Sequence, residues 1–202
     1  MLTEKFRTIN TKIYPKHIFQ SPKWIVLGVN NVCNLHCKMC DVGTQNLESN
    51  FAQNLVGTSP LNMPLELITK IIDQTAKSFP KSKLAYAFTE PLVYPHLIES
   101  VAYASKKNIY STITTNALTL KQKAKGLVDA GVNHIYVSLD GPEEIHNEIR
   151  GHKKSFQKAI EGIKEIQQYK NAPTIDVICA LTQWNIGYLE EFLNELKIID
   201  IN

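Results

Sequence analysis

The sequence predicts an α/β fold in which parallel strands alternate with helices, and three observations support this prediction. Short apolar runs rich in β-branched residues alternate along the chain with segments whose apolar residues recur at helical spacing. Helical segments between successive strands supply the crossovers that parallel pairing requires, and polar residues follow strand after strand. This pattern leaves a doubly wound open sheet and a partial or closed barrel equally possible. Both architectures place active sites at the carboxyl ends of their strands.

Length and composition indicate a single domain. The chain has 202 residues, of which 44% are hydrophobic and 20% charged, enough to bury one sizeable core. Its net charge of +3 comes from 22 basic and 19 acidic residues without a run of like charge, so no nucleic-acid partner is expected. No apolar stretch of about 18 residues and no secretory leader is evident, which predicts a cytoplasmic protein without a membrane span. We expect residues 1–22 to form an N-terminal leader segment and residues 23–202 to form the core domain.

The first predicted strand leads into a cysteine-rich loop. Residues 24–29 form an apolar, β-branched run that is typical of a strand buried on both faces. Residues 41–62 are rich in Gly, Asn, Gln, Ser and Thr, which indicates a long loop, and loops of this length in compact domains usually have a function. A helix then begins at Pro64, and Pro80 marks its end.

Further strand and helix units follow in the same order. Thr119, Ser155 and Asn185 are candidate N-caps, and Gly131 is a candidate helix end. Residues 197–201 begin like a sixth strand, which leads us to expect a further C-terminal region. Strands are expected at residues 83–88, 109–114, 134–139 and 174–181, and helices with apolar faces at residues 97–104, 120–128, 156–166 and 189–196.

Three of the four cysteines, Cys33, Cys37 and Cys40, lie within eight residues after the first predicted strand. Thiolates bind iron and zinc, and iron–sulfur clusters are typically held by four of them, so a set of three can leave one iron free to bind a substrate or cofactor. A zinc site completed by His36 is the alternative, although this compact set lacks a distant ligand pair that would clamp another segment. The fourth cysteine, Cys179, lies within the fifth apolar run and is expected to be a small buried core residue.

The spacing of these cysteines, with a strand before them and a long loop after them, resembles the cluster motif of the radical S-adenosylmethionine (SAM) enzymes. The resemblance implies that Cys33, Cys37 and Cys40 hold a [4Fe-4S] cluster whose fourth iron is chelated by the amino and carboxylate groups of SAM. It also implies a partial (β/α)6 barrel of parallel strands with outer helices. Met39 stands where the family usually has an aromatic residue beside the adenine, and a polarizable thioether can fill that role.

Polar residues at the ends of the later strands are the other candidate site residues. Glu90 follows the second strand, Asn116 follows the third, and Ser138 and Asp140 stand at the end of the fourth. Asn185 follows the fifth strand. In a parallel array these positions converge in space, so one site can combine residues that are distant in sequence. Each residue alone is also consistent with a turn or a helix cap.

The resemblance suggests roles for several of these residues. The segment Phe-Thr-Glu-Pro that contains Glu90 stands where the family has a Gly-Gly-Glu-Pro motif, so Glu90 is expected to meet the amino group of SAM although both glycines are absent. Ser138 is expected to help hold the carboxylate or the ribose, and Asp140 or Asn116 the ribose hydroxyls. Arg150 is a candidate for the carboxylate, because a guanidinium can bind it through two hydrogen bonds.

One further stretch points to a branch of the family. Residues 137–142, followed by His146 and Arg150, look like the fourth-strand segment of members that modify peptides and proteins and usually carry an auxiliary-cluster domain. With three of four cysteines committed, these residues cannot hold an auxiliary cluster. Either that domain lies beyond Asn202, or the substrate is a small molecule.

The function that the resemblance implies is reductive cleavage of SAM to methionine and a 5′-deoxyadenosyl radical. That radical would abstract hydrogen from a peptide or protein side chain or from a small metabolite. Such an enzyme needs a reductant such as flavodoxin or ferredoxin, while the protein supplies binding and orientation to its cofactors. The alternative function is a zinc-binding structural or interaction module without catalysis.

Overall fold

The computed structural model describes residues 9, 12–13, 21–55 and 58–198. Its strands are β1 (Trp24–Leu27), β2 (Lys83–Tyr86), β3 (Ser111–Thr115), β4 (His134–Ser138) and β5 (Thr174–Ile178). Its α-helices are α2 (Asn50–Gln53), α3 (Leu65–Ser78), α4 (Leu97–Lys106), α5 (Leu120–Ala130), α6 (Glu143–Arg150), α7 (Ser155–Gln167) and α8 (Leu189–Ile198). Two short 3-10 helices, η1 (Pro91–Val93) and η2 (Ile186–Tyr188), follow β2 and β5.

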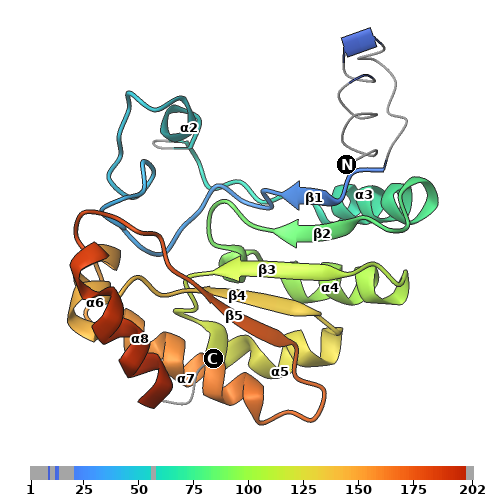
Figure 1. Cartoon of the computed structure of the whole chain (residues 1–202). Helices are drawn as coiled ribbons and strands as arrows, with labels where there is room; N and C mark the ends of the chain where they lie inside the picture. Colours follow the sequence, from blue (N-terminus) through green and yellow to red (C-terminus); the bar gives the residue numbers. More distant parts are fainter. Residues whose placement is uncertain (1–8, 10–11, 14–20, 56–57, 199–202) are drawn as a thin grey trace.

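The five strands form one parallel sheet in the order β1-β2-β3-β4-β5, which confirms the predicted α/β fold. Because the spatial order equals the chain order, the sheet is singly wound, and the doubly wound possibility is excluded for the described strands. Helices α3, α4, α5 and α7 contact one another in that order, as expected when every crossover has the same hand. Figure 1 shows the strands running toward the side where the α2 loop and α6 lie.

The core lies between the sheet and the layer of helices. Apolar residues of the strands meet apolar residues of α3, α4, α5 and α7, and burial of these side chains is the main term that stabilises the fold. The fully buried members include Leu84, Ile113, Ile135 and Val137 of the strands and Ile72, Leu97, Leu127 and Ile163 of the helices. No helix in the described ranges is both long and apolar enough to cross a membrane.

The first strand differs from its prediction. Trp24 is 42% exposed and Val26 is 48% exposed, so β1 is not buried on both faces. The reason is its position: among the described strands β1 pairs only with β2, and the helices cover the face of the sheet opposite to Trp24 and Val26. Alternation of exposed and buried residues is the expected pattern for a strand at such an edge.

The predicted sixth strand is wrong for its first two residues. Lys197 and Ile198 belong to the last turn of α8, which begins at Leu189 and buries Phe192 and Leu196. The remainder of this prediction, residues 199–201, lies outside the described residues, and so does almost all of the predicted leader.

The predicted helix boundaries are partly confirmed. Gly131 ends α5 in the left-handed conformation with φ of 77°, as expected. Thr119 is the N-cap of α5 but makes no capping hydrogen bond through its side chain. Ser155 is not a cap, since Lys154 holds that position and the Ser155 hydroxyl donates to Asn147 Oδ1 at 2.8 Å instead. Helix α6 was not predicted at all.

Backbone hydrogen bonds join the two ends of the long loop between β1 and α3. The amide of Asn31 donates to the carbonyl of Leu61 at 3.2 Å, and the amide of Met63 donates to the carbonyl of Val29 at 2.8 Å. The loop contains only one short helix, α2, so the predicted absence of longer elements is confirmed for its described residues. These hydrogen bonds fix the position of the cysteine segment relative to the end of β1.

Candidate active site

A pocket of about 240 Å³ lies at the carboxyl ends of the strands, next to the cysteine loop. Its walls come from the loop after β1, from the ends of β2, β3 and β4, and from the last residue of α6. The lining residues are Cys33, Cys37, Met39, Cys40, Phe88, Thr89, Glu90, Thr114, Thr115, Asn116, Ser138 and Arg150. Eight of the nine residues predicted from the sequence therefore share one pocket, and the ninth, Asp140, lies behind Arg150.

The thiols are held in a partly buried environment. Cys37 is only 6% exposed, and Cys40 donates its amide to the Cys37 carbonyl at 3.1 Å. Burial raises the pKa of Cys33 to about 11, and burial also raises the pKa of Cys37, although the charge of Arg150 opposes the latter shift. Because metals bind thiolates, loading such a site releases protons.

The cysteine loop is tied to the segment after β2 by hydrogen bonds. Asn30 Nδ2 donates to the Glu90 carbonyl at 3.0 Å, and the Glu90 amide donates to the Val32 carbonyl at 3.2 Å. The Thr89 hydroxyl donates to the Asn30 carbonyl at 2.9 Å. These contacts fix Glu90 relative to the three thiols.

Glu90 has a buried carboxylate with several protein partners. Its Oε1 accepts from the Thr115 hydroxyl at 2.6 Å and from the Leu92 amide at 2.9 Å, and its Oε2 accepts from the Asn116 amide at 2.8 Å. The residue is 1% exposed, and burial raises its pKa while these hydrogen bonds oppose the shift. A buried carboxylate at a pocket wall can bind a cationic group such as an ammonium.

Phe88 adopts the backbone conformation that glycine usually supplies. Its φ is 83°, in the left-handed region that is uncommon for residues with a β-carbon. The turn expected at the second strand end is therefore present although the family glycines are absent. The Phe88 ring lies over Gly28, where an added β-carbon would meet Phe88 Cδ2 at 3.2 Å.

Asn116 connects the end of β3 to the cysteine loop. Its Nδ2 donates to Asn34 Oδ1 at 2.8 Å and lies 4.0 Å from Cys33 Sγ. Its Oδ1 accepts from the Leu118 amide at 3.0 Å, which fixes the side chain in the turn after β3. The side chain thus combines a turn role with a contact to the thiol.

A buried ion pair lies beside the second thiol. Arg150 Nε donates to Asp140 Oδ2 at 2.6 Å, and Arg150 Nη1 lies 3.8 Å from Cys37 Sγ at a donor geometry. The Asp140 side chain is fully buried, and its Oδ1 accepts from the Ala180 amide at 3.0 Å. Asp140 does not line the pocket.

His146 and Asn185, for which the sequence suggested no role toward Asp140, both bond to its backbone. The Asp140 amide donates to His146 Nδ1 at 3.1 Å, and Asn185 Nδ2 donates to the Asp140 carbonyl at 2.8 Å. Burial lowers the pKa of His146 to about 3, with a further lowering by Arg150, so this histidine is neutral. Its signal was the spacing of four residues from Arg150, which places both on one helix face once α6 is recognised.

Helix α6 also contacts the cysteine loop through its backbone. The Lys38 amide donates to the Ile149 carbonyl at 2.8 Å, and Lys38 Nζ pairs with Glu148 Oε1 at 2.5 Å. Gly151, which ends α6 with φ of 67°, approaches the His36 carbonyl so closely that an added β-carbon would lie 2.9 Å from that oxygen. The loop is thus held between α6 and the segment after β2.

The donor set of three thiols in one pocket fits a [4Fe-4S] cluster with one iron left for another ligand. Among the described residues, no group of three or more His, Cys, Asp or Glu side chains is placed to hold one ion. His36, the proposed fourth zinc ligand, is exposed. Cys179 follows β5 and is half-buried rather than fully buried, and it packs against the core.

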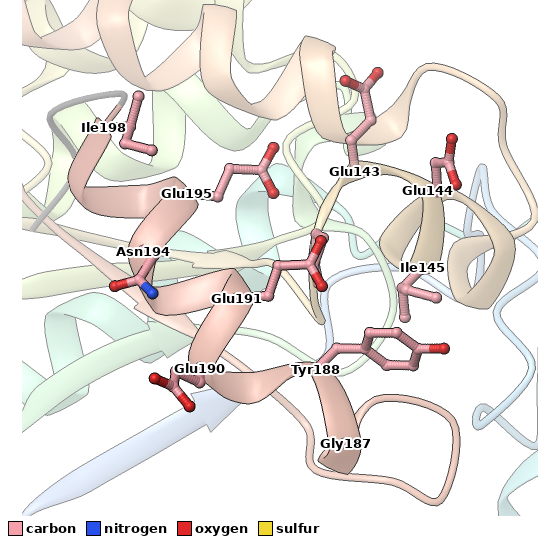
Figure 2. A pocket seen from close by; sticks show the side chains of 11 residues that line it. Glu143, Glu144, Ile145, Gly187, Tyr188, Glu190, Glu191, Asn194, Glu195 and Ile198 are labelled. Carbon is pink, nitrogen blue, oxygen red and sulfur yellow. The ribbon is translucent and has the colours of Figure 1, made fainter.

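A second, larger hollow of about 980 Å³ lies between α6 and α8 (Figure 2). None of the predicted site residues lines it. Its charged lining residues are Glu143, Glu144, Glu190, Glu191 and Glu195. Its donor set contains no thiol, so it does not contribute to the chemistry of the cysteine loop.

Relatives of the chain carry diverse names. It is 29% identical over 164 residues to the Fe-coproporphyrin III synthase of Methanosarcina barkeri, covering 79% of this chain and 38% of that protein. It is 31% identical over 144 residues to a GTP 3′,8-cyclase of Helicobacter pylori, covering 70% of this chain and 42% of that protein. The chain thus spans less than half the length of these two relatives.

The fold has counterparts among solved structures. Streptococcus suis SuiB bound to its precursor peptide SuiA superposes with a TM-score of 0.67 at 17% identity, covering 98% of this chain and 42% of that one. Such neighbours have partial TIM barrels, which agrees with the singly wound sheet described above. Residues 28–196 match the Radical SAM superfamily, and the chain belongs to that family.

Proposed function

We propose that this protein binds a [4Fe-4S] cluster through Cys33, Cys37 and Cys40 and uses it to cleave SAM reductively. The products are methionine and a 5′-deoxyadenosyl radical that abstracts hydrogen from a substrate. The observation that supports this most directly is the pocket in which three thiols meet a buried carboxylate and a guanidinium. Family membership supports the same reading, because the radical SAM family uses this cluster and SAM.

The pocket residues divide into two groups by charge. Glu90 presents a carboxylate to the ammonium of SAM, and the three donors from Thr115, Leu92 and Asn116 hold it in place. Met39 offers a thioether surface to the adenine. When bound, the cluster supplies the electron for cleavage.

A second set of pocket residues binds the anionic and hydroxyl groups of SAM. Arg150, with one nitrogen on Asp140, retains further N–H donors for the carboxylate. Ser138 and Asn116 line the same pocket and are the donors we place at the ribose or the carboxylate. Asp140 orients Arg150 rather than touching the ribose, because it is fully buried behind that guanidinium.

Substrate and electron donor belong to the same proposal. A peptide or protein side chain is one substrate class, which the peptide-bound SuiB structure makes attractive, and a small metabolite is the other. Flavodoxin or ferredoxin is the electron donor that we propose. We place the protein in the cytoplasm, where thiols stay reduced.

Anaerobic reconstitution with iron and sulfide tests the proposal. We expect a brown protein with about four irons per chain, and, after reduction with dithionite, equal amounts of methionine and 5′-deoxyadenosine from added SAM. A colourless protein that retains one zinc and leaves SAM intact would overturn it. The triple variant Cys33→Ala, Cys37→Ala, Cys40→Ala is the control for iron bound elsewhere.

A further inference from the structure

A charged, buried pair lies in contact with one of the cluster cysteines. Cys37 is 6% exposed, the Arg150 side chain is 12% exposed, and the Asp140 side chain is fully buried. Arg150 Nη1 is 3.8 Å from Cys37 Sγ, while Nε is 2.6 Å from Asp140 Oδ2. One guanidinium therefore contacts a thiol and a carboxylate through two different nitrogens.

The residue type at this position is itself informative. The chain contains 20 lysines but only two arginines, Arg7 and Arg150, and Arg150 is the only one in the described part of the chain. A guanidinium keeps its charge when buried and presents donors in a rigid fork, which lets it serve two acceptors at fixed positions. A lysine would supply one point charge without that geometry.

The location of the pair bears on the reduction potential of a cluster bound at these cysteines. Hydrogen bonds to the sulfurs and the net charge nearby set the reduction potential of an iron–sulfur cluster. Charges act more strongly in a water-poor interior than at the surface. Reduction adds one negative charge, which the positive guanidinium and its N–H donor stabilise and the Asp140 carboxylate destabilises.

We propose that Arg150 raises the reduction potential of the cluster by donating a hydrogen bond to Cys37 Sγ, and that Asp140 positions Arg150 and partly offsets its charge. This inference rests on the proposed function, because it presupposes the cluster. It adds to Arg150 a role in the absence of SAM, separate from any contact with the carboxylate of SAM.

Redox titration of the reconstituted protein without SAM tests the proposal. The ratio of reduced to oxidised cluster is followed by electron paramagnetic resonance at a series of applied potentials. In Arg150→Gln we expect this ratio at a fixed potential to fall at least about tenfold, which is 59 mV for a one-electron couple. In Asp140→Asn we expect the ratio to rise, because the opposing charge is removed.

Opposite signs in the two variants separate this role from a structural one. A general loosening of the site would move both potentials in the same direction, and that outcome would overturn the proposal. An unchanged potential in Arg150→Gln would also overturn it and leave SAM binding as the role of Arg150. If the wild-type protein assembles no cluster at all, the proposed function fails instead.

Lys38→Gln is the matched control. It removes one positive charge from the cysteine loop itself, but the Lys38 side chain is 39% exposed and forms its ion pair with the exposed side chain of Glu148. Water screens such a charge, so we expect the ratio to change less than about twofold. A shift equal to that of Arg150→Gln would show that any nearby charge suffices and would contradict the role of the buried contact.

A measurement without substitution at the site covers the case in which Arg150→Gln holds no iron. Protein grown with ¹⁵N-labelled arginine carries the label at only two residues, and Arg7→Gln removes the one outside the described part. Pulsed electron paramagnetic resonance of the reduced, SAM-free cluster should then detect a ¹⁵N coupling from Arg150. Absence of that coupling would overturn the hydrogen bond to Cys37.

Discussion

At the scale of single residues, the cysteines differ in their surroundings. Cys33 Sγ lies 4.0 Å from Asn116 Nδ2, and Cys37 Sγ contacts the Arg150 guanidinium. Cys179 lies outside the pocket, and its Sγ is 3.7 Å from Asn185 Nδ2. A thiol in a polar, converging site is poised for metal binding, whereas one packed against a core is not.

Single cysteine substitutions should therefore give unequal results. We expect Cys33→Ala, Cys37→Ala and Cys40→Ala each to abolish cluster binding, because two thiolates cannot hold four irons. Cys179→Ala should keep the full iron content and the visible absorption band. Iron analysis after anaerobic reconstitution measures both, and loss of iron in Cys179→Ala would contradict the assignment of that residue to the core.

Glu90→Gln should preserve the cluster and weaken SAM binding. Removing the negative charge costs one charge-assisted hydrogen bond to the ammonium, about 1 to 3 kcal/mol. The substitution also places an amide donor near the Asn116 or Thr115 donors, so some loss of thermal stability is expected. Calorimetric titration of the reconstituted protein with SAM measures the affinity. An unchanged dissociation constant would leave Glu90 with only its role in the turn.

His146 should make the protein sensitive to mild acid. Its pKa is about 3 in the folded state, against an ordinary value of 6.5, so below pH 6.5 the unfolded chain takes up a proton that the folded chain refuses. Stability therefore falls as pH decreases below 6.5, by up to about 1.4 kcal/mol per pH unit from this group. Urea unfolding of the metal-free protein at several pH values from about 7.5 to about 5 measures the slope.

His146→Asn is the variant for comparison. Asparagine keeps an acceptor for the Asp140 amide but does not titrate in this range. We expect a lower stability at neutral pH, since packing against Phe156 is lost, together with a shallower dependence on pH. A slope identical to that of the wild type would show that other groups cause the acid sensitivity.

Residue chemistry predicted much of the site but not its second layer of contacts. The cysteines were identified from their spacing and thiolate chemistry, and Glu90, Asn116 and Ser138 because polar residues at the strand ends of a parallel sheet must converge. Asp140 was one of two candidates for the ribose hydroxyls, and its ion pair with Arg150 and its full burial were not predicted, because burial of a carboxylate depends on which cation the tertiary structure brings to it. Sequence spacing carries no information on such a pairing.

At the scale of elements, α6 is the support of the cysteine loop. It carries Arg150 to Cys37, and its last turn binds the loop backbone through Ile149 and Lys38. The helix was missed in the sequence although Glu143 and Glu144 begin it and Gly151 ends it. Its few apolar residues gave a weak periodic signal, and tertiary contacts stabilise a helix of this length more than its own propensity does.

Gly151→Ala should disturb cluster binding from a distance. The residue has φ of 67°, and a methyl group would meet the His36 carbonyl oxygen at 2.9 Å, so both the helix end and the cysteine loop must shift. We expect lower iron content after reconstitution and a loss of about 1 to 3 kcal/mol in stability. Gly187→Ala is the matched control, because no atom lies within 4 Å of its added carbon. Equal iron content in the two variants would contradict the support role of α6.

The order and type of the elements were largely predictable, whereas the position of a strand at the edge of the sheet was not. Each strand between 83 and 178 and each helix of the outer layer was expected near its observed position, because local periodicity determines these elements. The exposure of Trp24 and Val26 was not predicted, since an apolar, β-branched run is the same for a central and an edge strand. Which neighbour a strand lacks is a property of the whole sheet.

At the scale of the whole molecule, the open sheet predicts a gradient of stability. Strand β3 has a neighbour on each side and helices over one face, and its residues Ser111, Thr112 and Ile113 are almost completely buried. Strands β1 and β5 each have one neighbour among the described strands, so half of their backbone groups face outward without a partner in the sheet. Local opening is easiest where such partners are missing.

Hydrogen exchange of the 202-residue chain should follow that gradient. We expect amides of β2, β3 and β4 to exchange more slowly than those of β1 and β5, because opening an edge strand breaks one ladder rather than two. Mass spectrometry of peptic fragments at two protein concentrations measures the order. Protection of β1 equal to that of β3 at both concentrations would contradict the gradient. Protection of β1 or β5 that appears only at high concentration would show that a second copy covers that edge, since pairing between edges depends on concentration.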